Sequence, residues 1–149
     1  MLGIIGREGL DIGTLWGPPD PTRQVPGLMA LEAFRNYDGK DAMFGDKGIA
    51  AASADQGELS VYGALRTKDN TVTLVVINKT YGDLTSTLTV KNLAASTTSA
   101  QAYLYSNANL AAIIAQPTVT VTPPSGSNTA STLSTTFPAQ PITILAMPD

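Results

Sequence analysis

Apolar and polar side chains alternate with a period of two along residues 58–67, and a nearly continuous apolar run follows at residues 71–78. In the first stretch the apolar positions from Leu59 onward share one face of a strand, because successive side chains point to opposite sides. The second stretch stays apolar on both faces around Val76, which is typical of a strand that is covered on both sides. Lys68-Asp69-Asn70 suits a tight turn between them, so the two stretches predict a central β-hairpin.

Short apolar stretches separated by turn residues continue to the end of the chain. The strands that we predict are 49–54, 58–67, 71–78, 84–93, 99–106, 118–122 and 142–147. Residues 109–115 fit one turn of helix, and the Ser/Thr-rich residues 123–135 fit a mobile loop. A mainly β fold is therefore predicted, an antiparallel β-sandwich of about seven to eight strands.

Residues 1–48 have a different character, with frequent glycine and proline. Leu10, Ile12 and Leu15 suggest a short strand that leads to Trp16, and the prolines at positions 18, 19 and 21 require a loop. Helical spacing of apolar residues predicts a helix over 27–37. The segment therefore reads as strand, loop and helix.

Length and charge restrict the possible functions. The chain has 149 residues, enough for one domain, and a net charge of −3 with scattered basic residues, so no nucleic-acid-binding face is predicted. No apolar run is long enough to span a bilayer, and no membrane partner is expected. Residues 1–6 are too short for the apolar part of a signal peptide, so either the chain is intracellular or its signal lies outside this sequence.

Cysteine and histidine are both absent. Disulfides, thiol nucleophiles, zinc sites of the usual kind and imidazole bases are thereby excluded, and we predict neither a metal site nor a cofactor. A pair of carboxylates remains the main option for catalysis. Glu8 with Asp11, and Glu32 with Asp38, are near in sequence, but solvated charges or loop caps explain them better.

Two short motifs carry little functional weight. The glycine-rich residues 3–9 have neither dinucleotide-binding nor P-loop spacing, and no Lys-Ser/Thr follows them. Asn78-Lys79-Thr80 matches the glycosylation sequon, a tripeptide that is common by chance.

Aromatic residues are the better candidates for binding, because sugars stack their apolar faces on exposed rings. Tyr62, Tyr103 and Tyr105 all point away from the apolar face of their strands, and they are expected to form a flat carbohydrate-binding platform. Trp16, beside the proline-rich loop, is a further stacking candidate. The alternative is that these rings pack under the helix or in the second layer of the sandwich.

Several stretches, in this order, resemble the last part of a glycoside hydrolase family 44 endoglucanase. They are Gly6-Arg7-Glu8-Gly9-Leu10-Asp11, Leu15-Trp16-Gly17-Pro18-Pro19-Asp20-Pro21, Phe34-Arg35-Asn36-Tyr37-Asp38-Gly39, Phe44-Gly45-Asp46, Ser53-Ala54-Asp55-Gln56, Val75-Val76-Ile77-Asn78-Lys79-Thr80, Thr136-Phe137-Pro138-Ala139 and Ile142-Thr143. The resemblance runs from near residue 1 to the end of the chain.

This resemblance implies a division of the chain at about residue 44. Residues 1–44 would be the remnant of the last βα unit of a catalytic (β/α)8 barrel, and residues 45–149 a β-sandwich accessory domain. The family cuts β-1,4-glucans such as carboxymethylcellulose and xyloglucan with retention. Its two catalytic glutamates lie on earlier barrel strands, and no position here matches them. The family sandwich also takes a strand from before the barrel, which this chain lacks.

The resemblance thus implies a non-catalytic C-terminal part of a cellulase, not itself an enzyme, whose sandwich supports the barrel. The alternatives are a stand-alone module that binds β-glucan, cellulose or xyloglucan, and an unrelated interaction sandwich. The expected partners are the barrel of the parent enzyme and a β-1,4-glucan polysaccharide. The parent would be a secreted bacterial enzyme. Because apolar surface and a sheet edge would be left open, we also expect a homo-oligomer.

Overall fold

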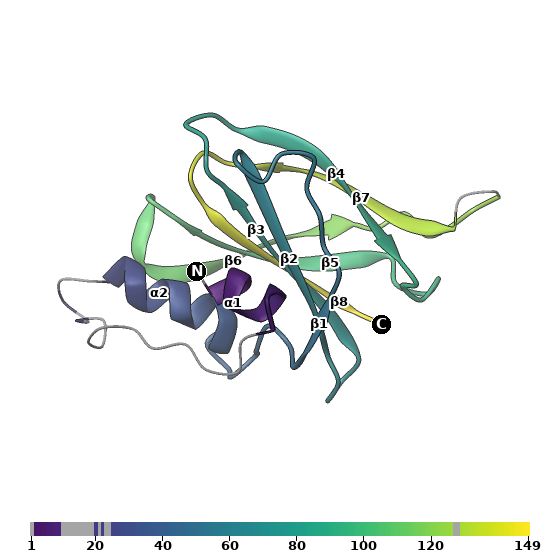
Figure 1. Ribbon diagram of the computed structural model, residues 1–149, viewed down its shortest axis with the longest axis horizontal. Coiled ribbons are helices and arrows are strands. Elements are labelled where there is room, and N and C mark those ends of the chain that lie inside the picture. Colours follow the sequence, from purple (N-terminus) through teal and green to yellow (C-terminus); the bar gives the residue numbers. More distant parts are fainter. Residues whose placement is uncertain (1, 10–19, 21, 23–24, 127–128) are drawn as a thin grey trace.

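The fold is that of a computed structural model that describes residues 2–9, 20, 22, 25–126 and 129–149 (Figure 1). Two helices precede the strands. The elements are α1 (Leu2–Arg7), α2 (Val25–Arg35), β1 (Lys47–Ile49), β2 (Leu59–Arg66), β3 (Thr71–Asn78), β4 (Leu84–Lys91), β5 (Ser99–Ser106), β6 (Asn109–Thr120), β7 (Ala130–Phe137) and β8 (Ile142–Pro148). Neither helix is long and apolar enough to cross a bilayer, a finding that covers the described residues.

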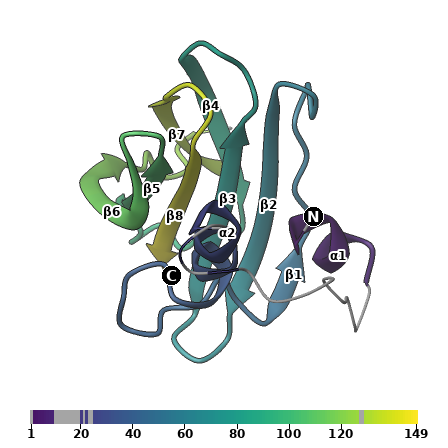
Figure 2. The same ribbon diagram turned by 90° about the vertical axis from the view of Figure 1, so that its left-hand side faces the viewer.

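The strands form two antiparallel sheets of very unequal size. The large sheet has six strands in the order β1-β2-β3-β8-β5-β6, and the small sheet pairs β4 with β7. The small sheet lies over one face of the large sheet, and the two helices lie on the opposite side (Figures 1 and 2). The predicted mainly β sandwich is therefore confirmed, with a third, helical layer added.

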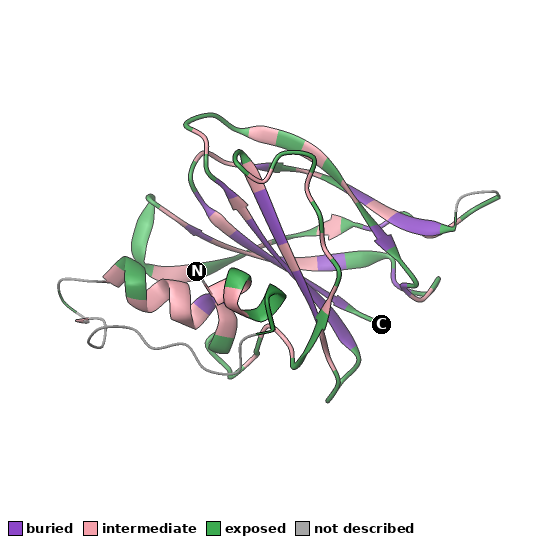
Figure 3. Cartoon of the chain, in the orientation of Figure 1, coloured by how far each residue is buried: buried purple, intermediate pink, exposed green. Residues whose placement is uncertain are grey.

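Strand β3 has apolar residues buried on both of its faces. Val76 is fully buried between the sheets with Phe137 and Leu145, whereas its neighbour Val75 is fully buried on the helix side with Ala33 of α2. Figure 3 shows the buried residues concentrated along the crossing strands and few in the helices. The large sheet is therefore the middle layer on which the other two depend.

The predicted central hairpin is confirmed. Strands β2 and β3 pair without a register shift from Leu59↔Asn78 to Arg66↔Thr71. Asn70 takes a left-handed φ of 53° in the turn, a conformation that asparagine tolerates better than most residues. Local turn chemistry and the apolar run thus agree with the tertiary structure.

The prediction of a helical turn at 109–115 and of a strand only at 118–122 is wrong. Residues Asn109–Thr120 form one long strand, β6, whose pairing with β5 is interrupted by two register shifts. These irregularities break the regular alternation of apolar and polar positions, which is the signal that a strand gives in sequence.

The prediction of a mobile loop over 123–135 is also wrong in its second half, where β7 begins at Ala130. Only Leu133 and Phe137 of this strand are large apolar residues, and both are buried between the sheets. The remaining positions are mostly serine and threonine, which are compatible with a strand when one face is exposed. The serine- and threonine-rich composition of β7 therefore resembles that of a loop, because the outer face of the strand is polar.

The N-terminal segment differs from its predicted strand, loop and helix in one respect. Residues 2–7 form the helix α1, which no pattern predicted because Gly3 and Gly6 are poor helix formers. The predicted helix is confirmed as α2, and the predicted strand at 10–15 lies outside the described residues. Strand β1 ends at Ile49, so most of the predicted strand 49–54 is a loop.

We predict that Val76→Asp will unfold the domain. An unpaired carboxylate would replace a side chain with no exposed surface, at a cost of roughly 3–5 kcal/mol. Urea unfolding followed by circular dichroism measures the change. Thr87→Asp, on the exposed face of β4, is the control and should leave the unfolding midpoint almost unchanged. Similar midpoints for both variants would show that β3 is not central to stability.

Candidate functional site

The three predicted platform tyrosines lie on one face of the large sheet, the face that the helices cover. Tyr105 is only 7% exposed, and its hydroxyl donates a hydrogen bond to the Leu110 carbonyl at 3.2 Å. The ring of Tyr103 packs against that of Tyr37, just after α2, with 5.0 Å between their centroids. The Tyr103 ring is therefore part of the packing between the helical layer and the sheet, and Tyr105 is buried beside β6.

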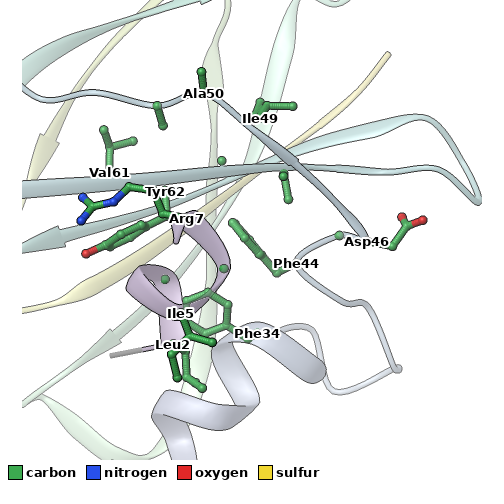
Figure 4. A pocket seen from close by; sticks show the side chains of 17 residues that line it. Leu2, Ile5, Arg7, Phe34, Phe44, Asp46, Ile49, Ala50, Val61 and Tyr62 are labelled. Carbon is green, nitrogen blue, oxygen red and sulfur yellow. The ribbon is translucent and has the colours of Figure 1, made fainter. Parts of the chain in front are cut away.

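Tyr62 lies beneath α1, at the wall of an apolar cavity of about 760 Å³. Its ring contacts the backbone of Gly3 so closely that a Cβ added there would lie 2.5 Å from the ring. Phe34, Phe44 and Ile5 line the same cavity (Figure 4). The tyrosines therefore share a face, as predicted, without forming an open platform. Trp16 lies outside the described residues.

A hydrogen-bonded arginine ties the segment after α2 to the central hairpin. Arg66 donates to the Tyr37 hydroxyl at 2.8 Å, to the Met43 carbonyl at 3.0 Å and to Asp69 at 2.8 Å. The bond to Asp69, more than any other interaction, raises the pKa of Arg66 above its usual value. Burial raises the pKa of Tyr37, and the bond from Arg66 opposes that rise. The network fixes how α2 sits on the sheet.

The open side of the sandwich carries a groove of about 1020 Å³. It lies between β4 and the β1–β2 side of the large sheet, and Leu59, Val61 and Leu88 are among the residues that line it. In the described residues β4 pairs only with β7, so its other edge has no strand beside it. An apolar groove along an open strand edge has the geometry of a site for one added strand.

Several of the described carboxylates hold the local structure together through hydrogen bonds or an ion pair. Asp38 accepts hydrogen bonds from the backbone of Lys40 and Ala42, and Glu8 pairs with Arg7 at 2.9 Å. Asp11, the other candidate near Glu8, lies outside the described residues. A hydrogen bond from Thr67 lowers the pKa of Asp46, and one from Arg66 lowers the pKa of Asp69. Both shifts favour the ionised carboxylate, the form that accepts these hydrogen bonds.

Solved structures of glycoside hydrolases match almost the whole chain. It is 34% identical to CelM2, a bifunctional glucanase-xylanase from a metagenome library, with a TM-score of 0.84, covering 99% of this chain and 26% of that protein. A family 44 endoglucanase from Clostridium acetobutylium is 21% identical with a TM-score of 0.81, over 98% of this chain and 27% of that one. A family 44 xyloglucanase from Paenibacillus polymyxa is 22% identical with a TM-score of 0.78, over 99% and 28%.

Sequence comparison alone gives a weaker match. The beta-mannanase/endoglucanase A of Caldicellulosiruptor saccharolyticus is 27% identical over 82 residues, which are 54% of this chain and 6% of that protein. No family model matches the chain. The resemblance to family 44 enzymes is confirmed by the structural matches, and the chain spans only about a quarter of the length of those enzymes.

We predict that the stability of the domain falls as the pH rises above about 10, the ordinary pKa of tyrosine. Burial raises the pKa values of Tyr37, Tyr103 and Tyr105, so the unfolded chain releases these protons before the folded chain does. Tyr37→Phe should make the decline less steep, because one of the three groups is removed.

Urea unfolding between about pH 8 and about pH 11 tests this prediction. Tyr81→Phe, which removes an exposed phenol, is the matched control. The prediction would be contradicted if the unfolding free energy changed with pH in the same way in the unsubstituted chain and in Tyr37→Phe.

Proposed function

We propose that this chain is the non-catalytic C-terminal part of an endo-β-1,4-glucanase of the family 44 type, with a sandwich that supports the catalytic barrel. The match to CelM2 carries the proposal, since 99% of this chain corresponds to 26% of a glucanase-xylanase at 34% identity. A part of that size fits an accessory unit better than a complete enzyme.

The helical layer supports a role in holding a larger structure. Ile4 of α1 is 45% exposed, and Leu28 and Leu31 of α2 are only partly buried, although each is apolar. A helix that is apolar beyond the face it packs against the sheet has a second face available for another element. On this proposal that element belongs to the barrel, and residues 1–44 are its last βα unit.

The chemistry of the carboxylates supports the non-catalytic assignment. A retaining glycosidase needs a general acid with a raised pKa close to a nucleophilic carboxylate. Asp46 and Asp69 have lowered pKa values, and Asp38 caps a turn. The catalytic glutamates then belong to earlier barrel strands, in keeping with the family resemblance.

The groove beside β4 supports the same relation to a larger protein. In the proposed parent it receives a strand from the region before the barrel, which pairs with the open edge of β4 and covers Leu59 and Leu88. A third strand would also bring the small sheet closer in width to the large one. The sandwich would then be built from both ends of the parent chain.

The coding sequence upstream of Met1 provides the direct test of the proposal. An open frame that continues in phase into a barrel with two glutamates supports it. A stop codon immediately upstream of a ribosome-binding site would overturn it.

We predict no hydrolase activity for the chain as it stands. Purified protein should release no reducing sugar from carboxymethylcellulose beyond a buffer blank, because the barrel and its glutamates belong to the rest of the parent. Release that grows in proportion to protein concentration, and that persists through repeated purification, would contradict the prediction.

We also predict that the isolated chain self-associates through the groove. Leu88→Arg places a charge in the groove and should shift the species seen by light scattering at micromolar concentration toward the monomer. Thr87→Arg adds the same charge to the opposite, exposed face of β4 and should leave the size unchanged. A parent chain that is already monomeric would show that the groove does not pair with a second copy.

A further inference from the structure

The most exposed large hydrophobic residue in the described part of the chain is Tyr81, at 91%. It lies in the turn between β3 and β4, at the end of the sandwich away from α1 and α2 (Figures 1 and 2). The other large hydrophobic residues that are exposed there are Ile4, Met43, Leu110 and Ile114, of which the most exposed reaches 49%. Tyr81 is therefore set apart by its degree of exposure.

The turn that carries Tyr81 is fixed by hydrogen bonds on both sides of it. Asn78 Oδ1 accepts from the backbone and the hydroxyl of Thr80 at 2.9 and 2.8 Å. The same hydroxyl lies 2.9 Å from the Gly82 carbonyl oxygen, so its one proton is shared between these two acceptors. The backbone on either side of the ring is thus held in place, so little conformational freedom remains to be lost on binding.

Asn78 anchors this turn to the loop between β7 and β8. Its side-chain nitrogen lies 2.8, 3.0 and 2.7 Å from the carbonyl oxygens of Gly82, Phe137 and Pro138. With 1% of its surface exposed, Asn78 is not accessible as a glycosylation acceptor in the folded chain. The residues that match the sequon therefore build a rigid turn.

Polar loops surround the base of the turn. Lys79 donates to the Gln56 carbonyl at 2.6 Å, and Asp83 accepts from the Ala139 backbone at 2.9 Å. The loops that hold Gln56 and Ala139 are thereby drawn next to the turn. The exposed ring therefore lies on a turn bordered by these two loops, and the Asp83 carboxylate, two residues from Tyr81, can also accept hydrogen bonds from hydroxyls.

We propose that Tyr81 is a contact residue for a β-glucan chain, stacking its ring on the apolar face of a sugar. The choice of ligand rests on the proposed function, which makes β-1,4-glucan the substrate class of the parent. A single ring in polar surroundings is too small for a stable protein interface, which needs about 800 Å² on each partner. A sugar ring has a matching size, with an apolar face for Tyr81 and hydroxyls for the polar groups around it.

The position of Tyr81 is compatible with a docked barrel. The helices α1 and α2, which carry the surface proposed for the barrel, cover a face of the large sheet, whereas the turn between β3 and β4 lies beyond the ends of the strands (Figure 2). A glucan held at Tyr81 would therefore bind without competing with that contact. The sandwich would then support the barrel on one side and retain polysaccharide on the other.

Affinity electrophoresis in gels that contain xyloglucan or hydroxyethylcellulose tests the proposal on the intact chain. We expect the unsubstituted chain to be retarded relative to a gel without polysaccharide. Tyr81→Ala should weaken binding by roughly tenfold or more, by analogy with the stacking of bases on aromatic rings. Tyr81→Phe keeps the ring and should retain most of the retardation. Leu110→Ala, which shortens another exposed apolar side chain, is the matched control and should be retarded as much as the unsubstituted chain.

Two results would overturn the proposal. One is an unsubstituted chain that no β-glucan gel retards, and the other is a Tyr81→Ala variant that is retarded as strongly as the unsubstituted chain. Neither result bears on the proposed function, whose test is the upstream coding sequence. Both Tyr81 variants alter an exposed side chain, so circular dichroism should confirm that they fold as the parent does.

Discussion

The structure depends on the burial of one sheet from both sides. Strand β3 contributes Val76 to the core between the sheets and Val75 to the core beneath α2, and β8 does the same with Leu145 and Ile144. In the described part of the chain, the two core clusters lie on opposite faces of these strands, one toward the small sheet and one toward α2. Both outer layers are therefore held by alternate residues of the same two strands.

The sequence predicted this middle layer well because its signal is strong and local. The apolar run 74–77 in β3 has no polar residue on either face, which is unusual in an exposed strand, and Asn70 supplied the turn before the strand. Strand β7 was missed because its serines and threonines resemble a loop, and its partner β4 is distant in sequence. Pairing of this kind is decided by tertiary packing, which local patterns do not contain.

The candidate binding residues illustrate the same limit. Alternation along the strands correctly placed Tyr62, Tyr103 and Tyr105 on one face, but it carries no information about which layer covers that face. The sequence pattern did not indicate Tyr81 as a binding residue, because Tyr81 belongs to a turn, where strand periodicity does not apply. Its signal was the side-chain chemistry of Asn78 and Thr80, which bond to nearby backbone and favour a fixed turn.

The place of β8 in the strand order has a consequence for how the chain folds. This strand comes last in the sequence and yet lies between β3 and β5, so the hairpins β2–β3 and β5–β6 have no direct pairing until it arrives. The contacts from Thr71 to Pro148 span much of the chain, and such non-local pairing slows folding. During synthesis the two hairpins would leave the ribosome with open edges, and the sheet would close in a single late step when Ile142–Pro148 inserts between them.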